Sequence, residues 1–266
     1  NRGRRRLPNT ARTRIARKVE RRAMQRGSLL LAGGGATTAA MIRNLRSLVR
    51  GEKALFVVLP HTSSDAVQAG QRSAALLQRY GLPHVRSVEA DDPATVAAAL
   101  NEASGVWIPG GDQNRFMQRV GAHREVQQAL RDVLLRGGVV GGTSAGASLI
   151  GAWMPAGEMR DTALRPDAVV TTRGLGLLPN AFVDQHLLRR QRLQRLVGAV
   201  LQHPELMGIG LDEDAWAVVS AGRLRVQAGQ VVMVQAVTPP RLRGGLFTAD
   251  NLHLRLLAAG EETSLG

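Results

Sequence analysis

The chain has 266 residues and a formal net charge of +14, with 44% hydrophobic and 21% charged residues. This composition is close to that of globular proteins, so it excludes a wholly disordered chain and allows a substantial core. The absence of cysteine excludes disulfides, a cysteine nucleophile and cysteine-ligated zinc or iron–sulfur sites. A covalent nucleophile must then be serine, threonine, lysine or a carboxylate. No apolar run is long enough to cross a membrane, so we expect a soluble, cytoplasmic protein.

Positive charge is concentrated at the N-terminus. Residues 1–26 hold 11 of the 35 Lys and Arg residues and one acid, whereas the rest of the chain has 24 basic and 20 acidic residues. Such a density of like charge predicts that residues 1–27 form a flexible extension. Weak binding of polyanions by this basic arm (residues 1–26) is the alternative interpretation. Residues 28–266 are then expected to form one α/β domain.

Short apolar runs alternate with helical patterns beyond residue 27, which is typical of a parallel sheet with crossover helices. Asp65 and Asp92 stand where they can cap the helices that follow them, and Pro93 fits the first helical position. Strands are predicted at 29–32, 55–59, 85–88, 106–108 and 139–140. The helices between them are expected to end near residue 50, near residue 80, before residue 106 and near residue 136.

The pattern becomes less regular after about residue 152. Strands are predicted at 168–171 and 181–183, followed by a helix at 186–202. The tail alternates apolar and turn residues, which indicates antiparallel strands that complete the sheet or add a small second one. These strands are expected at 208–211, 215–219, 223–226 and 231–237. The predicted fold class is α/β, a three-layer sandwich with a mostly parallel central sheet and extra C-terminal antiparallel strands.

Residues 142–146 (GTSAG) form a G-x-S-x-G motif between a predicted strand and a helix expected at 147–153. This is the context of a nucleophile elbow, in which a serine sits on a sharp strand-to-helix turn. Glycine at both ends avoids clashes between segments that the turn forces together. The motif therefore makes Ser144 the candidate nucleophile. A glycine-rich turn that binds phosphate, or merely packs tightly, is the alternative.

A serine nucleophile needs a base and an acid that orients it. Among six histidines, His186 stands apart because it follows a predicted strand, where open α/β sheets place their sites. Capping of a helix is the alternative role for this histidine. Glu213 follows another apolar strand, but it lies between Asp212 and Asp214, and spacing alone cannot choose among the three acids.

The glycine pair in residues 109–113 (PGGDQ) also follows a buried strand. Paired glycines let a backbone N–H approach a substrate oxygen, so Gly111 can join the Ala145 amide in an oxyanion hole. Gln113 is then placed to contact the substrate. A glycine turn in which Asp112 caps the next helix is an equally good interpretation.

Five motifs occur together in one order: IPGGDQ (108–113), GGTSAGAS (141–148), GLGLLP (174–179), DQHLLRRQRLQRL (184–196) and GIGLDED (208–214). In this combination the chain resembles the cyanophycinase family, serine peptidases related to peptidase E. The resemblance covers roughly residues 28–237 and leaves the basic arm unexplained. It implies a class I glutamine amidotransferase-like fold, a homodimer and no metal or organic cofactor.

The resemblance also implies roles for single residues. It makes Ser144 the nucleophile, His186 the general base and acid, and Glu213 the orienting carboxylate. The expected substrate contacts are Gln113, Asp184, Gln185, Arg190 and Arg195. Cyanophycin is an aspartate polymer that carries arginine on each side-chain carboxyl, so the arginines suit its carboxylates and an acid suits its guanidinium groups. The implied activity is an exopeptidase that releases β-Asp-Arg.

Two departures from the family pattern bear on substrate choice. Ala36 and Thr37 follow the first glycine run where the family usually has an acidic residue, and Asp214 is followed by Ala215 where it commonly continues toward a threonine. Two alternative functions therefore stay open. One is a peptidase of aspartyl or isoaspartyl dipeptides, and the other is a catalytically idle protein whose basic arm binds polyanions.

Overall fold

The computed structural model of the chain describes residues 26–265. Residues 1–25 lie outside the described residues, and with them nearly all of the basic arm, so its predicted flexibility and polyanion binding are not tested. Within the described part of the chain, no helix is both long and apolar enough to span a membrane.

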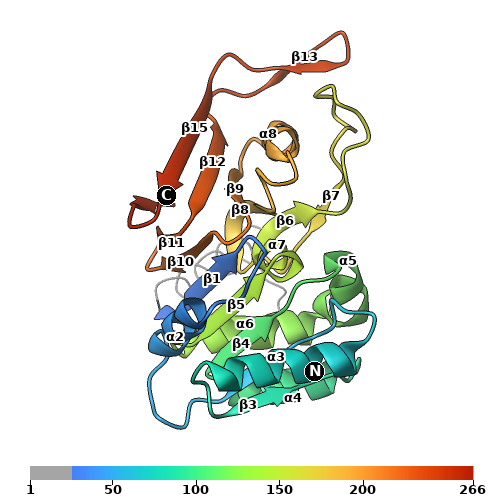
Figure 1. Ribbon diagram of the computed structural model, residues 1–266. Coiled ribbons are helices and arrows are strands. Elements are labelled where there is room, and N and C mark those ends of the chain that lie inside the picture. The colour runs from blue at the N-terminus through green and yellow to red at the C-terminus, as the bar shows by residue number, and fades with distance from the viewer. Residues whose placement is uncertain (1–25, 266) are drawn as a thin grey trace, which may run out of the picture.

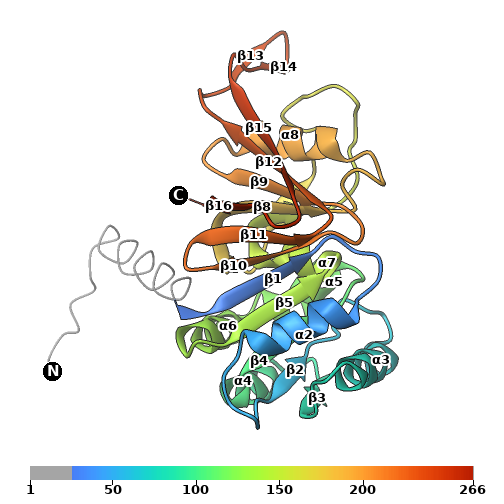
Figure 2. The same cartoon turned by 60° about the vertical axis from the view of Figure 1, so that its left-hand side comes forward.

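Eight strands form the first sheet, namely β1 (Ser28–Ala32), β2 (Phe56–Val58), β3 (Val85–Ser87), β4 (Gly105–Ile108), β5 (Val139–Thr143), β10 (Trp216–Ser220), β11 (Arg223–Ala228) and β16 (Glu262–Ser264). Their order is β16-β11-β10-β1-β5-β4-β2-β3. The run from β1 to β3 is parallel, whereas β10, β11 and β16 extend the sheet beyond β1 in antiparallel fashion (Figure 2). The mostly parallel sheet with added C-terminal strands confirms the predicted fold class.

Helices cover both faces of this sheet (Figure 1). They are α2 (Ala39–Ser47), α3 (Ala66–Arg79), α4 (Pro93–Glu102), α5 (Gln113–Phe116), the π-helix η1 (Met117–Gly121), α6 (Arg124–Leu135) and α7 (Ala145–Ile150). The predicted caps are confirmed, because Asp65 and Asp92 accept the amides of Gln68 and Thr95, both at 2.9 Å. Such caps satisfy amides that have no partner within the helix.

The core follows the alternation of side chains along the buried strands. In β1, Leu29 and Leu31 join the cluster that includes α4 and α6, whereas Leu30 packs on the other face with Ile42 and Leu45 of α2. All five residues of β1 are buried, which explains why Leu29 to Ala32 are apolar without alternation. Two helical layers around a central sheet therefore fix where the carboxyl ends of the parallel strands lie.

A second sheet has the order β15-β12-β9-β8-β6-β7. Its strands are β6 (Gly151–Pro155), β7 (Thr171–Arg173), β8 (Leu178–Gln185), β9 (Met207–Leu211), β12 (Gln230–Ala236) and β15 (Leu252–Ala258), with a separate hairpin of β13 (Arg241–Arg243) and β14 (Leu246–Thr248). One face packs on α8 (Leu193–Gln202), where Leu196 and Val200 meet Phe182 and Val232. The tail thus does both things considered from sequence, since it extends the first sheet and helps build a second.

Three predicted elements differ from the structure. The helix expected at 147–153 ends at Ile150, because Gly151 adopts an extended backbone and starts β6. The helix expected at 186–202 begins only at Leu193, since His186 and Gln191 have positive φ angles of 50° and 53° that a helix cannot contain. The strand expected at 168–171 lies at Thr171–Arg173.

Candidate active site

Ser144 occupies a sharp turn between β5 and α7. Its backbone is in an unusual conformation, with φ 52° and ψ −115°, and its amide donates to the Ala32 carbonyl at 2.9 Å. The flanking glycines are required sterically, because a Cβ on Gly142 would lie 2.4 Å from the Gly146 carbonyl carbon, and one on Gly146 would lie 2.0 Å from the Ile108 oxygen. A strained residue held by its surroundings is typical of functional sites.

The side chains of Ser144, His186 and Glu213 form a continuous chain of hydrogen bonds. Ser144 Oγ lies 2.9 Å from His186 Nε2, and His186 Nδ1 lies 2.7 Å from Glu213 Oε1. The three residues come from the turn after β5, the end of β8 and the loop after β9. The imidazole is 10% exposed and the Glu213 side chain 30% exposed. The three residues singled out from sequence therefore meet within hydrogen-bond reach.

This arrangement sets the protonation of His186. A carboxylate only accepts hydrogen bonds, so Nδ1 carries the proton and Nε2 presents its lone pair to the serine hydroxyl. Burial lowers the pKa of His186 below its ordinary value, and the positive charges of Arg190 and Arg192 lower it further, whereas the hydrogen bond and the charge of Glu213 raise it. The imidazole is therefore neutral near pH 7, which is the form that can accept a proton.

The three adjacent acids have separate tasks. Asp212 accepts the amides of Leu188 and Arg189, at 3.0 and 2.8 Å, and so fixes the loop after His186. Asp214 turns the other way, and its Oδ1 accepts the Ala36 amide at 3.0 Å. Glu213 is thus the acid that reaches the imidazole, a distinction that spacing in the sequence did not provide.

A glycine loop closes over the other side of the histidine. Gly34 has a φ of 117°, and a Cβ placed on it would lie 2.2 Å from His186 Cε1. The neighbouring Gly33 carbonyl accepts the His186 amide at 2.9 Å. The first glycine run is therefore part of the site, because its backbone packs directly against the imidazole ring.

The predicted oxyanion donors, Gly111 and Ala145, belong to two segments that adjoin Ser144. Ala145 is the first residue of α7, and the amides at the start of a helix have no partner within it. A Cβ on Gly110 would lie 3.4 Å from Ser144 Cβ, so the backbone of this glycine packs against the serine. Gly111 has a φ of 144°, and a Cβ there would lie 2.5 Å from the Thr62 oxygen. Only glycine fits at this position.

Asp184 and Arg195 are buried and bonded to each other. Their side chains are 0% and 3% exposed, and Arg195 forks onto Asp184, with Nε donating to Oδ2 at 2.9 Å and Nη2 donating to Oδ1. Asp184 Oδ1 also accepts the Gln185 amide at 2.7 Å. This buried pair joins the end of β8, which precedes His186, to α8, and substrate contact by these two residues stays a prediction.

Arg192 is a site residue that the sequence analysis did not single out. Its Nη1 donates to the Gln185 carbonyl and to Gln185 Oε1, both at 3.2 Å, and its Nη2 bonds Glu158. Gln185 Oε1 in turn lies 3.4 Å from Ser144 Oγ. The basic run at 189–195 indicated only a charged segment. The turn that precedes α8 brings Arg192 into contact with Gln185, which in turn lies beside Ser144.

The remaining predicted contacts have mixed positions. Arg190 is exposed, and its charge acts on His186. Gln113 is half-buried, and its Nε2 donates to the carbonyl of Pro155, the last residue of β6, at 2.7 Å.

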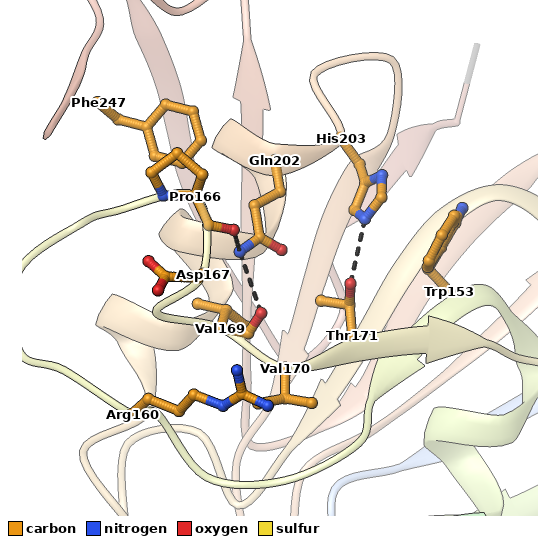
Figure 3. Close-up of a pocket in the computed structure, with 10 residues that line it drawn as sticks. All are labelled: Trp153, Arg160, Pro166, Asp167, Val169, Val170, Thr171, Gln202, His203 and Phe247. Carbon is orange, nitrogen blue, oxygen red and sulfur yellow. Dashed lines mark hydrogen bonds between the residues drawn. The ribbon is translucent and has the colours of Figure 1, made fainter. Parts of the chain in front are cut away.

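Two cavities in the described part of the chain lie in different places, one beside the glycine pair and one away from Ser144, His186 and Glu213. One of about 340 Å³ reaches Gly110 and Gly111. Another of about 440 Å³ lies on the second sheet and is lined by Trp153, Arg160 and His203 among others (Figure 3). None of the three hydrogen-bonded residues of the site lines this second cavity. Among residues 26–265, no group of three or more His, Asp or Glu side chains is arranged to hold a metal ion.

The α/β fold and the serine on its strained turn are those of a serine-type peptidase. The comparisons agree with this class, because the model of the family described as Peptidase family S51 matches residues 29–227. The chain belongs to peptidase family S51.

Similar curated proteins are named cyanophycinases. The protein from Trichormus variabilis is 32% identical over 270 residues, which cover 94% of this chain and 90% of its own. The protein from Geminocystis herdmanii is 26% identical over 252 residues, covering 89% of this chain and 93% of its own.

Two solved structures resemble the fold. A peptidase from an acI-B1 Actinobacterium matches with a TM-score of 0.66 at 19% identity, over 91% of this chain and 98% of its own. A putative peptidase E from Listeria monocytogenes EGD-e matches with a TM-score of 0.51 at 15% identity, over 76% of this chain and 98% of its own.

Proposed function

We propose that the chain is an exopeptidase that hydrolyses cyanophycin to β-Asp-Arg dipeptides through the triad Ser144, His186 and Glu213. The observation that carries the proposal is the unbroken hydrogen-bond chain from the serine hydroxyl through the imidazole to the carboxylate. The substrate is inferred from the relatives named cyanophycinase, which align with nearly the whole chain.

In the first half-reaction, Ser144 Oγ attacks an aspartyl carbonyl of the polymer backbone while His186 Nε2 takes the hydroxyl proton. The amides of Gly111 and Ala145 stabilise the oxyanion, and losing one such donor typically costs ~2.7 to 4 kcal/mol of transition-state stabilisation. The imidazolium, stabilised by Glu213, then gives its proton to the leaving amine as the C–N bond breaks.

In the second half-reaction, water attacks the acyl-enzyme ester. His186 accepts a proton from this water, and a second tetrahedral oxyanion forms on the same amides. Its collapse returns the proton to Ser144 Oγ and releases the dipeptide with a free carboxylate. The residues of this chain supply every proton acceptor and donor that the two steps need.

Recognition of the substrate falls to the basic groups around the triad. The exposed Arg190 is suited to a carboxylate of the polymer, since guanidinium groups bind carboxylates through paired N–H donors. Arg192 holds the side chain of Gln185 next to Ser144 Oγ. Asp184 and Arg195 act at one remove, because their buried ion pair orients the end of β8.

The test is incubation of the purified chain with insoluble cyanophycin and quantification of the released β-Asp-Arg. We expect release by the wild type and essentially none by Ser144→Ala. Ser148→Ala is the matched control, because this serine is buried on α7 and its hydroxyl has no hydrogen-bond partner among the described residues. Full activity of Ser144→Ala would refute the mechanism.

A parallel panel of aspartyl and isoaspartyl dipeptides tests substrate choice. Turnover of dipeptides with the polymer left intact would favour the dipeptidase alternative. Hydrolysis of neither, together with salt-sensitive polyanion binding that disappears on deletion of residues 1–26, would favour the idle binding protein. The homodimer implied by the family resemblance stays a prediction that light scattering after size-exclusion chromatography tests.

A further inference from the structure

A basic cavity lies beside the glycine pair that packs on the proposed nucleophile, and none of the arginines of residues 189–195 lines it. It has a volume of about 340 Å³ and is lined by Thr62, Ser63, Ser64, Ala69, Arg72, Ser73, Pro109, Gly110, Gly111 and Arg115. These residues come from the loop after β2, helix α3, the glycine pair after β4 and helix α5. None of them was singled out from sequence as a substrate contact, and Gly111 was predicted only as an oxyanion donor.

Gly110 connects this cavity to the catalytic serine. The glycine lines the cavity, and a Cβ placed on it would lie 3.4 Å from Ser144 Cβ and 3.8 Å from Ser144 Oγ. A group bound in the cavity therefore contacts a residue that itself packs against Ser144. The loop at Thr62 is held against the glycine pair, because the Asp112 amide donates to the Thr62 carbonyl at 2.9 Å.

The chemistry of the lining is that of an anion site. It contains two arginines and no acid, together with three serine hydroxyls. Arg115 is fixed, since its Nη1 donates to the Thr62 carbonyl at 2.9 Å. Arg72 is exposed on α3 and bonds Gln68 on the same helix, so its remaining N–H groups are free to meet a ligand. Guanidinium and hydroxyl donors around one opening suit a carboxylate.

We propose that this cavity is a subsite for a carboxylate of the substrate, with Arg72 as its specificity-determining residue. The inference rests on the proposed function, because cyanophycin carries a free carboxylate on every arginine branch. It extends that function by assigning a second carboxylate contact, on arginines of α3 and α5 rather than on the basic run that holds Arg190. The subsite holds a branch next to the scissile bond, so that the glycine amides and the serine meet the carbonyl between them.

The test varies the enzyme and the substrate together. Soluble oligomers of a few Asp-Arg units are prepared with free or amidated arginine carboxyls, and kcat and KM are measured for the wild type and for Arg72→Gln. We expect Arg72→Gln to raise KM about five- to ten-fold for the free carboxylate with little change in kcat, the size of one charge-assisted hydrogen bond at a partly exposed site. For the amidated oligomer, we expect Arg72→Gln and the wild type to have the same KM.

Arg79→Gln is the matched control, because this exposed arginine lies two turns further along α3 and does not line the cavity. Equal losses of Arg72→Gln on both oligomers would overturn the proposal, since a purely structural role affects both substrates alike. A loss as large in Arg79→Gln would also overturn it, because general attraction by positive charge would then be sufficient.

Binding to the Ser144→Ala variant separates this proposal from the proposed function. Calorimetric titration with the free and amidated oligomers needs no hydrolysis. Tighter binding of the free form that Arg72→Gln abolishes supports the subsite even if the wild type cleaves neither oligomer, an outcome that would refute only the proposed function. Equal binding of the two forms to Ser144→Ala would refute the subsite.

Discussion

Replacement of Glu213 by glutamine removes the negative charge of the triad while keeping a side chain of nearly the same size. In the wild type, Glu213 Oε1 accepts a hydrogen bond from His186 Nδ1–H at 2.7 Å, which leaves the Nε2 lone pair free to accept the proton of Ser144. The amide of glutamine can instead donate to Nδ1, and the proton then moves to Nε2, where it blocks the base. The variant also loses the negative charge that stabilises the imidazolium.

We expect kcat to fall roughly 10²- to 10⁴-fold, about 2.7–5.4 kcal/mol at 1.36 kcal/mol for each factor of ten. The Glu213 side chain is 30% exposed, so solvent moderates its effect and the upper end of this range is a limit. The pH profile should also move. Because Glu213 raises the pKa of His186, its removal lowers that pKa, and the acid limb of kcat/KM shifts to lower pH.

The assay is release of β-Asp-Arg between about pH 4.5 and 8, with the acid limb of the wild type expected below the ordinary histidine pKa of about 6.5. Glu205→Gln is the control, because Glu205 lies 3.9 Å from another histidine, His203, outside the site. A Glu213→Gln enzyme that keeps more than about a tenth of wild-type kcat, or whose acid limb moves to higher pH, contradicts the reasoning.

Two further predictions concern the framework of the site. Gly34→Ala should abolish activity, because its Cβ would enter the space of the imidazole, whereas Gly51→Ala has a similar positive φ with no atom within 4 Å of the new Cβ and should leave activity unchanged. Arg195→Met should lower the free energy of unfolding by about 3–5 kcal/mol in urea denaturation, because it leaves the Asp184 carboxylate buried without its ion pair. Arg195→Met combined with Asp184→Asn should recover part of that loss, and an uncoupled, additive loss would contradict the assignment.

Much of the fold could be predicted because its signals are local. The buried parallel strands contain continuous apolar runs, such as residues 29–32 of β1, and the acids that cap α3 and α4 stand directly before their helices. The elements that were misplaced are those where a longer-range contact decides. Gly151 ends α7 and begins β6 because the backbone there pairs with β8, which no pattern within residues 145–155 indicates.

The candidate site divides in the same way. The turn at Ser144 could be predicted from the sequence, because its glycines are required by contacts within the turn itself and with the adjoining strand. Asp184 and Arg195 were expected to contact the substrate, and Arg192 was not singled out. All three are buried, but a run of charged residues does not indicate which of its side chains the fold will bury.

The sequence by itself determined a strand–turn–helix that exposes one serine, together with the order of apolar strands around it. Residue spacing left Asp212, Glu213 and Asp214 open and the family resemblance favoured Glu213, but only the tertiary structure showed that Glu213 reaches His186. It also decided that Arg72, on a distant helix, lines a cavity with Gly110, which packs against Ser144. The physical reason is that periodicity encodes which side of a segment is buried. Which side chains meet across segments depends on how β5, β8 and β9 are aligned within two separate sheets.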